Sequence, residues 1–436
     1  MPPPFAKRAK NIKIMLIYRV LSILLFPFLE LYLLYRVIKK KEDRSRLKER
    51  VGHATQDRPE GEVVWIHAVS VGEANSALTL VDELLKFSPK ISILFTTTTL
   101  TSASIIAAKL PQFRGQVIHQ FLPIDSYFCV QNFLNFWQPR VAIFVESEIW
   151  PNLIYEARKL GVLSFLVNAR MSEKSVKKWR IARIFGFKIF DQFAAIFAQS
   201  AEAKNLLQKL TKQEILLYGN LKSQAQSLVV NFDELQKLKA QIADRKIFVA
   251  ASTHKGEEEI ILQSFERLKK EFSDLLLVII LRHPNRSEEV KLLLSGKKFA
   301  QRSKNETINS STEIYLVDSL GELGIFYSLT NFAFIGGSLL EIGGHNPFEA
   351  IKLNCAIISG PNIFNFKEIY SDLVAGGGCI IASSNQEITD AATKFLSDKN
   401  LASEINKKAN AVIKNSDNIA KKIVTKIDQI LMLPTT

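Results

Sequence analysis

Short apolar segments alternate with longer amphipathic segments along most of this chain after residue 60. Twelve of the apolar segments have the length and composition of strands, and they form two series of six. The first series is 63–69, 91–96, 116–122, 141–145, 163–167 and 194–198; the second is 247–251, 275–281, 314–317, 332–335, 356–359 and 379–381. Strands that alternate with helices form parallel sheets between helical layers. The sequence therefore predicts an α/β protein with two doubly wound domains that face each other across a cleft.

The composition fits two ordinary folded domains. The chain has 436 residues, of which 47% are hydrophobic and 23% charged, and this excludes a largely disordered protein. Its three cysteines lie far apart, which argues against a zinc ribbon or a disulfide scaffold and indicates a reducing compartment. We expect the first domain over 51–222 and the second over 223–436, with a final amphipathic helix near 401–431 that packs back across both domains.

The positive charge of the chain is concentrated at its N-terminus. The formal net charge is +14, and residues 1–50 carry +9 of it, from 13 lysines and arginines against 4 acidic residues. The rest of the chain carries only +5. A nucleic-acid-binding protein would spread basic residues along a groove of its folded domains, so this distribution argues against that class.

Residues 12–38 are mostly apolar and predict a membrane anchor within an N-terminal segment, 1–50. Arg19, Pro27 and Glu30 interrupt the apolar run, and its longest uncharged part is shorter than the roughly 20 residues of a regular span. Three alternatives remain open: a single spanning helix, an amphipathic helix that lies in the membrane interface, or a buried helix of the folded domain. Basic residues flank the run on both sides: Lys7, Arg8, Lys10 and Lys13 before it, and Arg36, Lys39, Lys40, Lys41, Arg44, Arg46, Lys48 and Arg50 after it.

The heavier basic flank follows the apolar run. The positive-inside rule then predicts that the folded domains remain in the cytoplasm. The same basic residues would attract the anionic head groups of membrane lipids. No small-residue cleavage site follows the run, which argues against a cleaved signal peptide.

Charged side chains follow the predicted strands of the first domain, and ligands of such sheets bind beyond the carboxyl ends of the strands. Glu73 follows the first strand, where it suits a general base and equally suits a helix N-terminus. Glu146 and Glu148 both follow the fourth strand, and one of them could serve only as a helix cap. Lys222 lies near the domain boundary, where it either reaches the cleft or lies on the surface.

Residues suited to anion binding follow the strands of the second domain. Residues 251–257 open a helix, where backbone N–H groups and the helix dipole favour an anion. Arg282 and His283 end the next strand, and the planar fork of an arginine suits a phosphate. Gly321 to Leu323 open a further helix.

The densest group of such residues is the glycine-rich segment 336–349. Its glycines allow close approach of a ligand, and we expect Asn346 to cap a helix that begins at Pro347. Glu349, one turn into that helix, could accept hydrogen bonds from a ribose diol. Turn formation alone explains the glycines but not the His-Asn-Pro-Phe-Glu order.

Several familiar motifs are missing from the sequence. It contains no HExxH, no DxD and no paired cysteines and histidines, so we expect no metal. It also contains no GxxxxGK[ST] and no GxGxxG, which argues against P-loop and NAD-dependent enzymes.

Seven segments, taken in order, resemble the transferases of 3-deoxy-D-manno-oct-2-ulosonic acid (Kdo) in lipopolysaccharide biosynthesis. The segments are SVGE (70–73), ESEIWPN (146–152), NARMS (168–172), GNLK (219–222), STHKGEE (252–258), RHPNR (282–286) and GGHNPFEA (343–350). The resemblance covers nearly the whole chain, including the basic N-terminal anchor. One departure is Asn285, which stands where the family usually has an acidic residue.

The resemblance implies an enzyme with the GT-B glycosyltransferase fold, built of two Rossmann-like domains. Such an enzyme moves Kdo from CMP-Kdo to a lipid A precursor, lipid IVA, and inverts the configuration at the anomeric carbon of the sugar. The resemblance places it at the cytoplasmic face of the inner membrane, in contact with membrane lipids and not with nucleic acid. It implies no cofactor besides the donor substrate, with the acceptor on the first domain and CMP on the second.

The resemblance also assigns roles to single residues. Glu73 would be the proton acceptor, and Glu146 and Lys222 would stabilise the transition state. The residues that would hold the CMP moiety are Arg282, His283, Gly321, Glu322, Leu323, Asn346, Pro347, Phe348 and Glu349.

Two other functions remain possible on the sequence. One is another GT-B nucleotide-sugar enzyme, such as a UDP-sugar transferase or epimerase, whose pocket near Asn346 would bind uracil. The other is a membrane-bound nucleotide-binding module without turnover, which would bind CMP and be indifferent to changes at Glu73.

Overall fold

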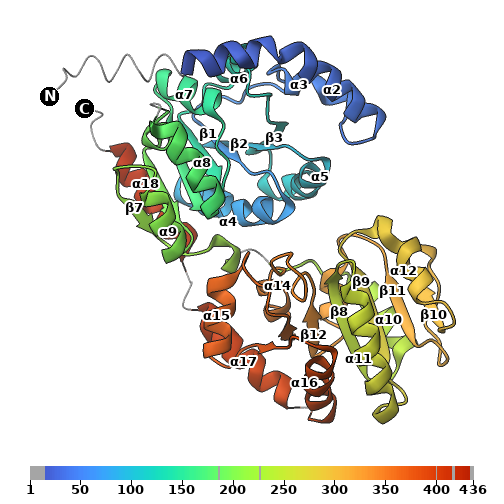
Figure 1. The fold of residues 1–436 in the computed structure, drawn as a ribbon. Helices are drawn as coiled ribbons and strands as arrows, with labels where there is room; N and C mark the ends of the chain where they lie inside the picture. The colour runs from blue at the N-terminus through green and yellow to red at the C-terminus, as the bar shows by residue number, and fades with distance from the viewer. Residues whose placement is uncertain (1–14, 185–186, 225–226, 399, 415–417, 433–436) are drawn as a thin grey trace. The chain divides into compact units, whose positions relative to one another are not determined.

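The computed structural model describes residues 15–184, 187–224, 227–398, 400–414 and 418–432. It divides into two compact domains (Figure 1). The first domain is Met1–Gln226 together with Asn418–Thr436, and the second is Ser227–Asp417.

The first domain is built on a parallel sheet of seven strands in the order β3-β2-β1-β4-β5-β6-β7. Its strands are β1 Val63–His67, β2 Ser92–Thr97, β3 Val117–Phe121, β4 Val141–Val145, β5 Leu163–Ala169, β6 Ala195–Ala198 and β7 Ile215–Leu217. Its helices after residue 60 include α4 Val71–Phe87, α5 Leu100–Lys109, α6 Tyr127–Trp137, α7 Pro151–Lys159, α8 Glu173–Ile184 and α9 Ala201–Gln208. Val63 and Trp65 of β1 pack into one apolar cluster, while Val64 and Ile66 pack into another. Helices therefore cover both faces of the sheet, which is why its strands are continuous apolar runs.

The second domain repeats this architecture, with strand order β10-β11-β9-β8-β12-β13-β14. Its strands are β8 Ile247–Thr253, β9 Leu276–Leu281, β10 Phe299–Gln301, β11 Ile314–Val317, β12 Phe332–Ile335, β13 Ala356–Ser359 and β14 Ile380–Ile381. Its helices include α10 Phe232–Ile242, α11 Glu257–Glu271, α12 Ser287–Leu293, α13 Leu323–Tyr327, α14 Phe348–Ile351, α15 Lys367–Ala375, α16 Asn385–Ser397 and α17 Leu401–Lys414. Two apolar clusters again lie on opposite faces of the sheet.

The twelve strands predicted from the sequence are all present, and the structure adds two. The additional strands, β7 and β10, are three residues each and lie at the edges of their sheets. Their length alone does not explain why they were not predicted, since β14 has only two residues and was predicted.

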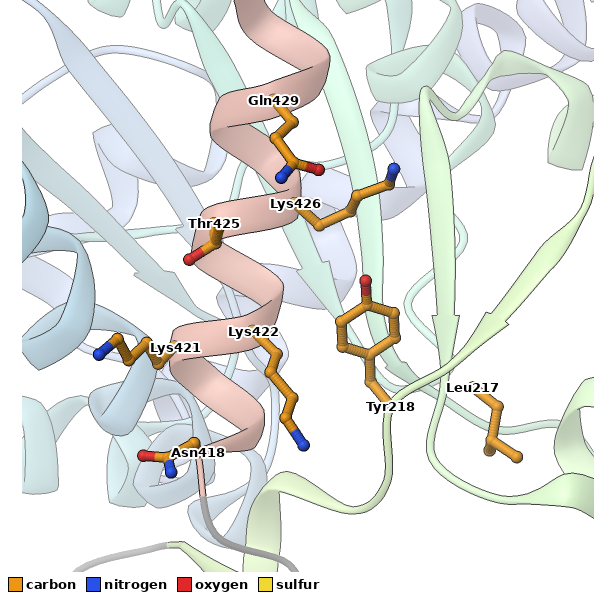
Figure 2. A pocket seen from close by; sticks show the side chains of 8 residues that line it. All are labelled: Leu217, Tyr218, Asn418, Lys421, Lys422, Thr425, Lys426 and Gln429. Carbon is orange, nitrogen blue, oxygen red and sulfur yellow. The ribbon is translucent and has the colours of Figure 1, made fainter.

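The C-terminal segment differs from the single helix near 401–431 that we predicted to pack across both domains. It forms two helices, α17 in the second domain and α18 (Ile419–Met432) in the first. Ile419, Ile423 and Ile427 recur every four residues on α18 and are buried in the apolar cluster that includes α4. Figure 2 shows Lys422 and Lys426 on the opposite, open side of α18, toward Tyr218. The chain thus returns to its first domain at the end. It crosses to the second domain between Gln226 and Ser227, not at the predicted 222/223, and crosses back between Asp417 and Asn418.

The N-terminal segment packs on the first domain as two helical pieces with a bend between them, Met15–Leu24 and α2 (Phe26–Ile38). In the part of the chain that the structure describes, no single helix has the length and apolar character of a membrane span. The two pieces meet these criteria only together, and they are bent by 53°. The start of the predicted anchor and the flanking residues Lys7, Arg8, Lys10 and Lys13 lie outside the described residues.

The polar residues of the first helical piece face the protein. The Tyr18 hydroxyl donates to Asp125 Oδ2 over 3.0 Å, and Arg19 forms an ion pair with the buried Glu156. The outer side of both pieces is apolar and exposed, with Leu16, Ile17, Val20 and Leu24 on the first piece and Phe28 and Leu31 on α2. This is the reverse of an ordinary surface helix, whose apolar side faces the core.

The basic flank is partly neutralised inside the protein. Arg36 and Arg50 both pair with the buried Glu42, and Arg46 pairs with the buried Glu49. The five remaining basic residues after the apolar run are exposed: Lys39, Lys40, Lys41, Arg44 and Lys48. The surface charge available to lipid head groups is therefore smaller than the sequence count indicates.

Candidate functional site

Each sheet reverses its strand order once near its centre, and the predicted site residues follow the strands on either side of these points. In the first sheet the reversal lies between β1 and β4, which precede Glu73 and Glu146. In the second it lies between β8 and β12, which precede the segments with His254 and His345. Such switch points are the usual ligand positions of open parallel sheets.

Glu73 lies in the first turn of α4, where it closes a capping box. Ser70 is the N-cap, and its hydroxyl accepts from the Glu73 N–H and donates to Glu73 Oε1. The Val69 N–H donates to Glu73 Oε2 over 2.8 Å. Burial, followed by the charge of Glu146, raises the pKa of Glu73 although these hydrogen bonds oppose the shift. The same carboxylate therefore caps the helix and has the raised proton affinity of a general base.

Glu146 is buried between two cations. Its Oε1 lies 2.6 Å from Lys222 Nζ, and its Oε2 lies 2.7 Å from Arg170 Nε. Burial acts to raise its pKa, but Lys222 and Arg170 together outweigh burial and leave the pKa lowered. The residue has a φ of +62°, a conformation that costs energy for any residue with a side chain. Glu146 is thus held ionised by its surroundings, in contrast to Glu73.

Hydrogen bonds from two asparagines hold the Lys222 segment in place. Asn220 Oδ1 accepts from the Lys222 N–H, and Asn168 Oδ1 accepts from the Leu221 N–H. A Cβ on Gly72 would lie 3.9 Å from Lys222 Cε, so the lysine stem passes beside the turn that carries Glu73. The predicted residues Glu73, Glu146 and Lys222 are therefore brought together.

Glu148 has different partners from Glu146. Trp150 Nε1 donates to Glu148 Oε2 over 2.8 Å, and Nε2 of the buried His67 lies 3.5 Å from the same oxygen. The other ring nitrogen of His67 lies 2.9 Å from Thr96 Oγ1. Glu148 therefore belongs to a chain of aromatic and hydroxyl groups at the same edge, while Glu146 pairs with Lys222 and Arg170.

No role was predicted for Arg170 or His67. Arg170 directly follows β5, the strand next to β4, and His67 ends β1. Their pairing with glutamates of a neighbouring strand end could not be read from spacing, since it depends on strand order.

Three histidines and an arginine gather at the switch point of the second domain. His254 Nε2 lies 2.8 Å from His345 Nε2, and the rings of His254 and His283 are 5.3 Å apart in an edge-on arrangement. Burial and then the charges of its neighbours His283 and Arg282 lower the pKa of His254 to about 4. Burial and then His254 lower that of His345 to about 3. Both imidazoles are thus neutral near pH 7, which lets one donate to the other.

Glu257 holds the loops of this site together. It is fully buried and accepts from the backbone N–H groups of His254, Gly337, Ser338 and Leu339. A protein carboxylate thereby occupies part of the anion pocket that we predicted at 251–257. The next residue, Glu258, pairs with Arg286 through two hydrogen bonds of 2.9 and 3.2 Å.

Asn346 accepts a hydrogen bond near the helix start as predicted, but α14 begins at Phe348 and not at Pro347, which is its N-cap residue. Asn346 Oδ1 accepts from the Phe348 N–H, and its Nδ2 donates to Glu349 Oε1 over 3.1 Å. Helix α13 packs against α14, and burial, followed by the charge of Glu349, raises the pKa of Tyr327 in α13. The helices that begin after Gly321 and Asn346 are therefore neighbours.

The side chain of Glu322 is engaged within the protein. It accepts hydrogen bonds from Arg302 Nε over 3.1 and 3.2 Å. Gly321 before it has a φ of +84°, which suits a glycine. The Glu322 carboxylate is thus occupied by Arg302. Among the described residues, no group of three or more histidines, cysteines and acidic residues is placed to hold a metal ion.

Two family profiles match the chain. The profile described as "3-Deoxy-D-manno-octulosonic-acid transferase (kdotransferase)" matches residues 45–225. The profile described as "Glycosyl transferases group 1" matches residues 233–412. Each profile thus falls on one of the two domains.

Relatives of known name cover nearly the whole chain. It is 35% identical to a 3-deoxy-D-manno-octulosonic acid transferase of Rickettsia bellii, over 90% of this chain and 93% of the relative. It is 36% identical to the transferase of the same name from Haemophilus influenzae, over 87% and 90%. Among solved structures, UDP-GlcNAc 2-epimerase from Neisseria meningitidis has a TM-score of 0.58 at 17% identity, over 85% of this chain and 100% of that one. At that identity the likeness shows the two-domain fold alone.

Proposed function

The chain belongs to the 3-deoxy-D-manno-octulosonic acid transferase family and is a glycosyltransferase with the GT-B fold, and from this premise we propose its substrates and mechanism. The proposed donor is CMP-Kdo, and the proposed acceptor is the lipid A precursor lipid IVA. In one in-line displacement, the acceptor oxygen bonds to the anomeric carbon as the bond from that carbon to the CMP phosphate oxygen breaks. This displacement inverts the anomeric centre.

Glu73 is the proposed proton acceptor. The attacking hydroxyl must lose its proton as the new bond forms, and a carboxylate takes it best when its pKa lies near the working pH. Burial and the charge of Glu146 shift the Glu73 pKa in that direction. Hydrogen bonds from Ser70 and Val69 hold the carboxylate in one orientation.

Glu146 and Lys222 are the proposed transition-state stabilisers. The reacting sugar acquires oxocarbenium character, which a fixed negative charge stabilises. Glu146 stays ionised because Lys222 and Arg170 pair with it. The departing CMP carries a phosphate charge, and Lys222 offers it a cation. We assign this role to Glu146 rather than Glu148, because Glu148 is bonded to Trp150 instead.

The CMP moiety is assigned to the second domain. Arg282 and His283 follow β9 and are exposed, as a phosphate site requires. The backbone of 321–323 and the residues Asn346, Pro347, Phe348 and Glu349 complete the proposed nucleotide site. Protein cations and N–H groups balance the phosphate charge, and the proposal includes no metal.

We place the enzyme at the cytoplasmic face of the inner membrane. The support is the exposed apolar side of Met15–Leu24 and α2, next to the exposed Lys39, Lys40 and Lys41. Because Arg19 and Tyr18 bind the folded domain, this segment suits attachment along the interface. Attachment to the membrane would bring the enzyme to a glycolipid acceptor in the same membrane.

The observation that carries the proposal is the Glu146 ion pair with Lys222 and Arg170, beside a Glu73 of raised pKa. The test is CMP release from CMP-Kdo by the detergent-solubilised enzyme, with and without lipid IVA. We expect release to depend on the acceptor and the glycolipid to gain the mass of Kdo. Competition by UMP as strong as that by CMP would favour a UDP-sugar enzyme instead.

A further inference from the structure

A cavity of about 600 Å³ lies beneath the bent N-terminal helices in the first domain. Leu21 lines it from the first helical piece, Leu25 from the bend, and Leu29 and Leu33 from α2. The opposite wall includes Leu122 and Ile124, which follow β3, and Trp150, which precedes α7. Its volume lies within the range of about 300–1,000 Å³ that is typical of small-molecule sites.

The charged groups in the wall of this cavity already have partners in the protein. Arg50 pairs with Glu42 and donates to the Leu122 carbonyl. Asp125 accepts from the backbone N–H groups of Asn152 and Leu153. The cavity thus offers a ligand mostly apolar surface, which suits a hydrocarbon chain better than a phosphate or a sugar.

The cavity is open to the outer apolar side of the helices. Leu21, Leu25 and Tyr32 line it and are also 51%, 54% and 53% exposed. Leu24, Phe28 and Leu31 lie on the exposed side of the same helices. A hydrocarbon chain can therefore pass from this outer surface into the cavity without crossing a polar rim.

A short series of hydrogen bonds links the cavity to the proposed base. Thr99 lines the cavity, and its hydroxyl accepts from the Ser102 N–H. Ser102 Oγ donates to the Val69 carbonyl over 2.7 Å, and the Val69 N–H donates to Glu73 Oε2. Trp150, on the cavity wall, donates to Glu148. The polar head of an amphiphile whose tail fills the cavity would thus lie toward Glu73.

We propose that this cavity binds one acyl chain of the lipid acceptor and so positions the acceptor hydroxyl at Glu73. The inference rests on the proposed function, since it assigns a subsite for the acceptor of that reaction. It predicts that much of the acceptor affinity comes from the chain and not from the sugar.

The test compares two tryptophan substitutions on α2. Leu29→Trp fills the cavity, whereas Leu31→Trp adds the same side chain on the exposed side of the helix. We expect Leu29→Trp to raise the KM for lipid IVA by at least about tenfold, with kcat and the KM for CMP-Kdo unchanged. Leu31→Trp should behave as wild type, and neither variant should change the KM for the deacylated acceptor disaccharide. An unchanged KM in Leu29→Trp, or an equal rise in both variants, would overturn the proposal.

A second readout separates failure of this inference from failure of the proposed function. Photoreactive myristate is cross-linked to the full chain, and the labelled peptides are identified by mass spectrometry. We expect label on α2 and on 122–125, lost in Leu29→Trp and displaced by lipid IVA. Label elsewhere, or displacement by phosphatidylglycerol vesicles but not by lipid IVA, contradicts the proposal. If wild type transfers no Kdo to any acceptor, the proposed function fails while the labelling still decides whether the cavity takes an acyl chain.

Discussion

The ammonium nitrogen of Lys222 lies 2.6 Å from Oε1 of Glu146, inside the first domain. Glu146 follows β4 and Lys222 lies in a short 3-10 turn near the end of the domain, so the pair joins two distant parts of the chain. Arg170 completes the arrangement on the other carboxylate oxygen. A buried carboxylate between two cations stays charged where an isolated one would take up a proton.

Replacing Lys222 with methionine should therefore harm both folding and catalysis. Glu146 would keep only Arg170, and breaking a buried ion pair costs about 3–5 kcal/mol. We expect that loss in the free energy of unfolding, measured by urea titration, together with loss of transfer. Lys86→Met, which breaks an exposed pair with Glu83, should cost less than about 1 kcal/mol. Equal effects of the two substitutions would contradict this account.

The acid limb of the profile of kcat/KM against pH should reflect the protonation of Glu73. Its pKa is raised above the ordinary 4.5, so the base becomes protonated, and kcat/KM falls, at a higher pH than for an ordinary glutamate. The Ser70 hydroxyl opposes this shift. Ser70→Ala should therefore move the acid limb to still higher pH.

Ser200→Ala is the matched control for that substitution. Ser200 is the N-cap of α9 and does not contact Glu73. Both variants lose a cap worth about 1 kcal/mol, but only Ser70→Ala should shift the rate profile. An acid limb that stays in place in Ser70→Ala would argue against Glu73 as the titrating base.

The histidine pair of the second domain should make stability fall in mild acid. The folded pKa values of His254 and His345, about 4 and about 3, lie below the ordinary 6.5. The unfolded chain therefore binds protons first, and the contribution of the neutral pair is lost as pH falls below 6.5 toward those values. Denaturant titrations from pH 7 to about 4 should show this decline, and it should be smaller in the double variant His254→Gln, His345→Gln. A decline of the same size in that variant would exclude the pair as its cause.

Gly337 should be required for the site and not only for its turn. It has a φ of +66°, and a Cβ there would lie 3.0 Å from the His345 ring. Gly296 has a φ of +80° and open space around it. Alanine at either position should cost about 1–2 kcal/mol of stability from the backbone conformation. Only Gly337→Ala should also weaken CMP binding, measured by calorimetry; equal affinity in both would contradict the prediction.

Much of the fold could be predicted because its strands are buried on both faces and so appear as continuous apolar runs. The edge strands β7 and β10 were missed because they are short and only partly apolar or buried: β7 becomes exposed toward its end, and β10 ends in a glutamine. The end of the chain was predicted as one helix because α17 and α18 are both amphipathic. Nothing in a local pattern says that the isoleucines of α18 pack on α4.

The candidate site was predictable at the level of strand ends. Glu73, Glu146 and Lys222 were named, and the structure brings them together. Two interpretations of Glu73 were predicted, a helix cap and a general base, and they are compatible. The same carboxylate accepts from the N-cap Ser70 and has a raised pKa. The Arg170 contact, the φ of Glu146 and the ion pairs of Arg36 and Arg50 depend on neighbours distant in sequence, so no spacing rule could supply them.

The most direct test of the central claim is the rate of Kdo transfer by Glu73→Gln, measured beside its affinity for CMP. Glutamine keeps the size and hydrogen-bonding capacity of the side chain but cannot take up the acceptor proton. The account predicts that transfer falls by at least about a hundredfold while the Kd for CMP stays the same. Transfer at the wild-type rate in this variant would contradict the role of Glu73 as the base.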